Sequence, residues 1–233
     1  MVDPIVLEAE EEFRKYHQRL RRELDEANWH FSVVKCISDN ARDYLRELNQ
    51  APAFWSLTIK AHRYLCLMHL NNFFGKEAKD KHLHMISFLD FIEKNLNIFS
   101  SQAFERRLRT AGRYDEIAAK FNSKIITEKV EQDRQKLEKL PIPSLKAWRN
   151  KILSHIDKND IAQNVNIAKK YPIKTKQIAE IIDTLDDMLN GYSVAFDFVT
   201  HAKGLAIEHG IDYILEAIRY RLNAKNSAPQ KAT

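Results

Sequence analysis

The chain has 233 residues, of which 44% are apolar and 30% charged, a balance that excludes global disorder. With only five glycines and six prolines it lacks the turn residues of sandwiches and barrels, so the composition indicates an all-α protein. The formal net charge is +5, but residues 146–176 alone hold eight basic and two acidic side chains, an excess that suits a polyanion-binding surface or a solvated helical face.

Apolar residues at helical spacing and the positions of the helix breakers together predict the elements of the fold. Ser100 is expected to cap one helix and Ser144 another, and the apolar residues on most sides of 53–73 predict a central helix. In chain order, the predicted helices cover residues 5–49, 53–73, 81–96, 102–110, 113–139, 145–156, 175–199 and 211–222.

These helices predict a single all-α bundle over residues 1–223, with residues 1–24 as a long N-terminal helical arm and residues 224–233 as a disordered tail. Phe13, Tyr16 and Leu20 of the arm are candidates for clasping a second subunit.

The chain carries no signal peptide and no transmembrane run, so a cytoplasmic protein without a membrane partner is expected. Cys36 and Cys66 lie in apolar helical surroundings, which predicts two buried free thiols in a reducing compartment.

Neither a metal site nor a cofactor site is predicted. His82 and His84 fit a solvated helix start better than a metal site, and His62 and His69 lie two helical turns apart, too far for one ion. Two further groups of charges have structural interpretations: Asp183, Asp186 and Asp187 as a solvated face, and Arg106, Arg107, Arg109 and Arg113 either as an RNA-binding surface or as the counterpart of the acidic N-terminus.

The segment from Leu145 to Asp157 holds the candidate catalytic residues. On a helix, Arg149 and His155 lie about 120° and about 9 Å apart, so two copies across a twofold axis bring both residues to one cleft more readily than one copy does. Histidine supplies a base or acid near neutrality for attack by a ribose 2′-hydroxyl, and arginine supplies a fixed cation for the phosphate. The alternative for His155 is a packed core histidine.

The residues Arg149-Asn150, four intervening positions and His155 resemble the signature of the HEPN superfamily. The preceding Pro-rich break, the Trp-Arg-Asn-Lys start and the apolar helix from Phe54 to Phe74 resemble its abortive-infection, AbiU-like branch.

This resemblance implies a HEPN-like helical bundle that forms a homodimer, with a metal-independent endoribonuclease site shared between the subunits. Arg149 would stabilise the phosphate, His155 would act on the 2′-hydroxyl or the leaving oxygen, and Asn150 would assist. Some family members carry a tyrosine two positions after the histidine that a partner antitoxin nucleotidylates, whereas this chain has Asp157.

The expected partners are therefore RNA (tRNA or mRNA), a second copy of the chain and an antitoxin protein, with Lys146, Lys151 and Lys158 as the RNA-binding residues. The expected activity is that of a toxin or phage-defence ribonuclease. Two alternatives stay open: a non-catalytic helical module that binds nucleic acid or a partner protein, and a nucleotide sensor that keeps the catalytic pair.

Overall fold

The computed structural model describes residues 4–75, 82–113, 125–148, 172–202 and 206–227. Within these ranges every regular element is a helix, which confirms the all-α prediction. The elements are α1 (Pro4–Asn40), α2 (Leu45–Leu48), α3 (Pro52–Asn71), α4 (Met85–Lys94), the 3₁₀-helix η1 (Leu96–Phe99), α5 (Ser101–Thr110), α7 (Thr127–Glu138), α8 (Ile142–Trp148), α11 (Thr175–Asp197) and α12 (Ala206–Ser227).

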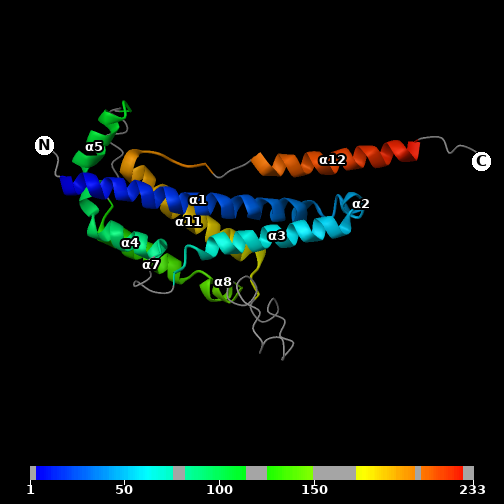
Figure 1. Ribbon diagram of the computed structural model, residues 1–233, viewed down its shortest axis with the longest axis horizontal. Coiled ribbons are helices and arrows are strands. Elements are labelled where there is room, and N and C mark those ends of the chain that lie inside the picture. Colours follow the sequence, from blue (N-terminus) through cyan, green and yellow to red (C-terminus); the bar gives the residue numbers. More distant parts are fainter. Residues whose placement is uncertain (1–3, 76–81, 114–124, 149–171, 203–205, 228–233) are drawn as a thin grey trace, which may run out of the picture.

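The long helix α1 runs through the molecule, and α3, α4, α11 and α12 pack against it (Figure 1). It starts with Pro4 in its first turn, and no glycine or further proline interrupts it before Asn40. Helix α4 lies beside the N-terminal half of α1, and α7 packs on α4 and α11. Helix α12 lies along the C-terminal half of α1 (Figure 1). Among the described helices, none combines the length and the apolar content needed to cross a bilayer.

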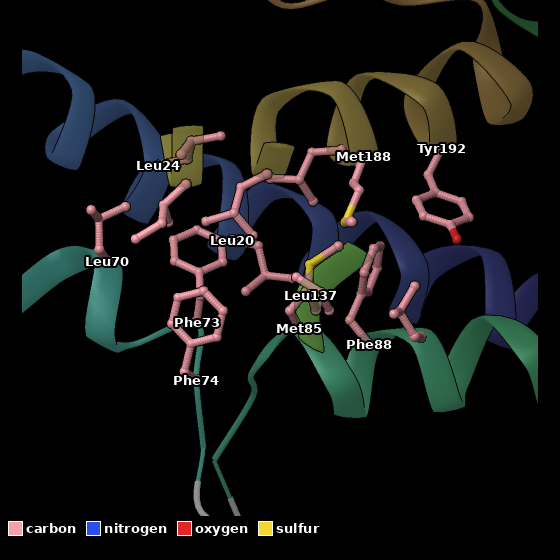
Figure 2. Packing of buried hydrophobic residues seen from close by; sticks show 14 of the residues in the cluster. Leu20, Leu24, Leu70, Phe73, Phe74, Met85, Phe88, Leu137, Met188 and Tyr192 are labelled. Carbon is pink, nitrogen blue, oxygen red and sulfur yellow. The ribbon is translucent and has the colours of Figure 1, made fainter. Parts of the chain in front are cut away.

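The main core lies where the N-terminal half of α1 meets α4, α7 and α11 (Figure 2). Phe13 of α1 is 2% exposed, and its ring centroid lies 5.3 Å from that of Phe99 and 4.3 Å from that of Phe196. Because Phe13 and Leu20 are buried within their own chain, the prediction that they clasp a second subunit is wrong.

A second, smaller core joins the C-terminal half of α1 to α3 and α12, through Ile37, Trp55 and Leu215. Helix α12 continues to Ser227, beyond the predicted start of the tail at residue 224. The boundaries of one domain over 1–223 and of a tail stay predictions.

Several local predictions are confirmed and others are corrected. The Ser100 side chain caps α5 by accepting the backbone N–H of Ala103 at 3.3 Å, and both cysteines are buried and free. In contrast, α8 begins at Ile142, so Ser144 lies inside the helix instead of capping it; proline is tolerated in a first helical turn, which lets Pro143 be helical.

Candidate functional site

Arg149, Asn150, His155, Lys151 and Lys158 all fall in residues 149–171, the signature segment, which lies outside the described residues. The structure does describe the two ends of this segment: α8, which leads into it, and residues 172–174, which lead out of it into α11.

Helix α8 is fixed to the body of the protein by Leu145 and Trp148, which are buried in the main core. The Trp148 ring packs against Tyr64 of α3, with centroids 6.2 Å apart. Trp148, the residue directly before the signature segment, is therefore held against α3.

The Arg63 side chain of α3 contacts one described residue on each side of the signature segment. Its guanidinium carbon lies 5.5 Å from the centroid of the Trp148 ring, and its Nη2 donates a hydrogen bond of 2.7 Å to the carbonyl oxygen of Ile173. The Nε atom of Arg63 is buried and has no hydrogen-bond partner within the described ranges. One side chain therefore ties residue 148 to residue 173.

Helix α7, which precedes α8, is fixed to α11 by a buried carboxylate. Asp133 is fully buried and accepts hydrogen bonds from the hydroxyl of Tyr192 at 2.9 Å and from Lys136 at 3.0 Å. Burial and the neighbouring Asp133 carboxylate raise the pKa of Tyr192, so this hydroxyl stays protonated and keeps donating.

Lys146 is the one predicted RNA-binding residue that the structure describes. It is half-buried on α8, and its ammonium nitrogen lies 3.5 Å from the carbonyl oxygen of Gly75, in the loop after α3. On the other side of the signature segment, Lys174 and Lys176 are exposed at the start of α11. The described part of the basic stretch thus flanks the signature segment at both ends.

Two of the four arginines singled out in the sequence contact the acidic N-terminal helix. Arg106 and Arg107 both contact the carboxylate of Glu10, which is 2% exposed on α1, so they serve as counterparts of the acidic N-terminus. Arg107 also donates from Nε to the carbonyl oxygen of Phe196 at 2.8 Å. These two side chains hold α5 on α1 and α11.

One face of α3 is apolar and exposed. Its side chains lie within about 80° of one another around the helix and point away from the core. They are Phe54, Leu57, Leu65 and Met68, exposed by 60%, 66%, 37% and 42%. The prediction of a central helix buried on most sides is therefore wrong for this face, which we call the α3 stripe. A contiguous exposed apolar surface of this kind marks an interaction site.

The family model described as AbiU2, HEPN_AbiU2, matches residues 10–217. This range runs from the first turns of α1 into α12 and includes the whole signature segment. No curated protein and no solved structure matches the chain.

Proposed function

The chain belongs to the HEPN AbiU2 family, and on that premise we propose that it is a metal-independent endoribonuclease of toxin or phage-defence type that acts on RNA in the cytoplasm. The observation that carries the proposal is the sequence Arg149-Asn150-x4-His155 placed directly after Trp148, the residue by which α8 is packed on α3. The arginine, the amide and the histidine are the residue types that phosphodiester transfer within RNA requires.

In the proposed reaction, the ribose 2′-oxygen attacks the neighbouring phosphorus while His155 accepts the 2′-hydroxyl proton. The bond from phosphorus to the 5′-oxygen then breaks, and this oxygen takes up a proton from the histidine of the shared site. Arg149 balances the charge that develops on the phosphate oxygens, and Asn150 orients one of them. The products are a 2′,3′-cyclic phosphate and a 5′-hydroxyl.

The active form is proposed to be a homodimer with a site shared between the subunits. The α3 stripe supports this arrangement, because it borders Tyr64, whose ring packs on Trp148 at the end of α8. A second copy that covers the stripe brings its own α8 next to this one. The separation of Arg149 and His155 around a helix also favours a site built from two copies.

Lys146, Lys151 and Lys158 are proposed to contact the RNA backbone, together with the exposed Lys174 and Lys176. Each phosphate contact of this kind releases counterions, so RNA binding should weaken steeply as the salt concentration rises. An antitoxin for this chain would act by a route other than nucleotidylation of a tyrosine two positions after His155, since that position is Asp157.

The experiment is a cleavage assay in EDTA with labelled single-stranded RNA and with total tRNA. We compare the wild type with His155→Ala and Arg149→Ala, and use His82→Ala and Arg22→Ala, which alter exposed residues of the same types, as controls. We expect 2′,3′-cyclic phosphate products from the wild type and both controls, and a rate lower by a factor of about 100 or more in each signature variant.

Undiminished cleavage by His155→Ala and Arg149→Ala would disprove the proposed site. Salt-sensitive RNA retention by all five proteins without any product would instead support the non-catalytic binding module.

A further inference from the structure

Helices α1 and α3 run antiparallel and together carry a cluster of ionisable side chains that the proposed nuclease does not use. Glu23, Glu26 and His30 are spaced by three and four residues on one face of α1, and His62 and His69 are spaced by seven residues on one face of α3. The two faces meet, since α1 packs more extensively on α3 than on any other described helix.

The contacts within this α1–α3 cluster are close. Nδ1 of His30 lies 2.8 Å from Nδ1 of His62, and the rings of His30 and His69 are stacked with centroids 5.8 Å apart. At the other end of the cluster, Nδ1 of His69 lies 2.9 Å from a carboxylate oxygen of Glu23.

Three of these residues bring ligand atoms to one point. Glu26, His30 and His69 each place one ligand atom within 4.8 Å of the other two, and all three side chains are half-buried. Ligand atoms around a tetrahedral zinc ion, at about 2.0–2.1 Å from the metal, lie about 3.4 Å apart. Rotation of these half-buried side chains on their two helices would bring the three ligand atoms to this spacing. His62, whose Nδ1 lies 2.8 Å from Nδ1 of His30, is outside this group of three, so a water molecule would take the fourth position.

His69 is also held in the tautomer that can bind a metal through Nε2. The Glu23 carboxylate accepts the Nδ1–H of His69, which leaves the lone pair of Nε2 for a metal; carboxylate–histidine pairs of this kind orient the ligands of zinc sites. Asn72 donates a second hydrogen bond of 2.8 Å to the same oxygen of Glu23 and so fixes its position.

We propose that Glu26, His30 and His69, with a water molecule, bind one zinc ion that clamps α1 to α3, with Glu23 as the residue that positions His69. Two imidazoles with one carboxylate are a ligand set that suits Zn²⁺ better than Mg²⁺ or Ca²⁺, which prefer oxygen ligands. The site stabilises the helix pair and takes no part in RNA cleavage, so it stands or falls separately from the nuclease.

The test is isothermal titration of the EDTA-treated, dialysed full chain with ZnCl₂, and with CoCl₂ to record the visible absorption of tetrahedral cobalt. We expect one zinc ion per chain, a tetrahedral cobalt spectrum, and a melting temperature raised by roughly 5–10 °C at zinc concentrations about 100 times Kd. His30→Gln, His69→Gln and the isosteric Glu26→Gln should abolish or severely weaken binding. Glu23→Gln, which alters only the positioning residue, should weaken it about 10–100-fold.

His82→Gln is the matched control, because it removes an exposed histidine outside the cluster and should bind zinc like the wild type. Circular dichroism of each zinc-free variant separates the loss of a ligand from the loss of the fold, and Glu26→Gln keeps the test valid if a histidine variant fails to fold. The proposal is overturned if the wild type binds no zinc, if His30→Gln and Glu26→Gln bind it unchanged, or if only His82→Gln loses it.

Discussion

His17 is a buried histidine whose neutral form stabilises the fold. It is 7% exposed in α1, its Nε2–H donates to the carbonyl oxygen of Leu189 at 3.0 Å, and its ring stacks on Phe13. The pKa of His17 is lowered from 6.5 to about 4, chiefly by burial and to a smaller extent by the neighbouring His201 and Arg21, against the opposing effect of the hydrogen bond to Leu189.

This pKa predicts that acid destabilises the protein through His17. In the unfolded chain the imidazole takes up a proton as the pH falls below 6.5, whereas in the folded chain it does so only near pH 4. Its contribution is therefore present at neutral pH and is lost progressively as the pH falls from 6.5 to about 4. We expect about 2 kcal/mol of this loss between pH 7 and pH 5.

The measurement is urea unfolding at pH 7 and pH 5 for the wild type and for His17→Gln, whose amide also donates to a carbonyl. The variant should lose about 2 kcal/mol less than the wild type over this interval, while His82→Gln should behave like the wild type. Because His30 and His62 add to the wild-type slope in the same direction, the difference between the two proteins isolates His17. Equal slopes in His17→Gln and the wild type would contradict the assignment.

The burial of two polar side chains, Asp186 and His84, could not be predicted from the sequence. Asp186 was assigned to a solvated face, yet it is 5% exposed and its Oδ1 lies 2.6 Å from Nη1 of Arg21. The two residues are 165 positions apart, so no local pattern links them.

His84 was likewise assigned to a solvated start of α4. It does begin that helix, accepting the backbone N–H of Ser87 at 3.2 Å, but it is 3% exposed because its ring packs against Gly75, where a Cβ would lie 2.2 Å from it.

At the scale of elements, Arg63 on α3 joins Trp148 to Ile173, the described residues on the two sides of the signature segment. Arg63→Ala removes the contact over Trp148 and leaves the Ile173 carbonyl without its guanidinium donor. We expect this variant to unfold with about 2 kcal/mol less free energy and to cleave RNA at least about tenfold more slowly. Arg63→Lys should recover part of the stability but less of the cleavage, because an ammonium cannot stack and donate at the same time as a planar guanidinium does.

Urea unfolding and the cleavage assay are run on both variants, with Arg22→Ala, which removes an exposed arginine of α1, as the control. A drop in stability without any change in cleavage would show that Arg63 supports the fold alone and does not position the signature segment.

The elements themselves were largely predictable, because helices in this chain are bounded by residues with clear local roles. Pro52 starts α3 and Ser100 caps α5 in the way their sequence positions suggest. What each face of a helix contacts was less predictable. The candidate catalytic residues came from a short motif, whereas Arg63 lies 85 residues from Trp148 and no sequence signal connects them. The approach of Glu26 and His30 of α1 to His69 of α3 could not be predicted either, because the residues lie on different helices and no local spacing connects them.

At the scale of the whole molecule, the packing of the helices leaves the α3 stripe exposed, whereas apolar side chains of the N-terminal half of α1 are buried in the main core. The apolar residues first expected to clasp a second subunit pack within the chain, and the apolar helix first expected in the centre offers an exposed face instead. The proposed dimer therefore depends on α3. A surface of this length beside α8 matches the requirement of a twofold interface that brings two signature segments together.

The double substitution Leu57→Lys with Met68→Lys tests this interface. Both side chains are exposed in the single chain, by 66% and 42%, so the variant should keep its helical circular dichroism and its melting temperature. In a twofold dimer each substitution occurs twice and places charge in an apolar contact, so dissociation should increase by a factor of about 100 or more. Light scattering after size exclusion should then show a dimeric wild type and a monomeric variant, with Ile126→Lys, 48% exposed before α7, as the control that stays dimeric. Because the proposed active site takes residues from both subunits, RNA cleavage should disappear with the dimer; a monomeric variant that still cleaves would show instead that one chain holds a complete site.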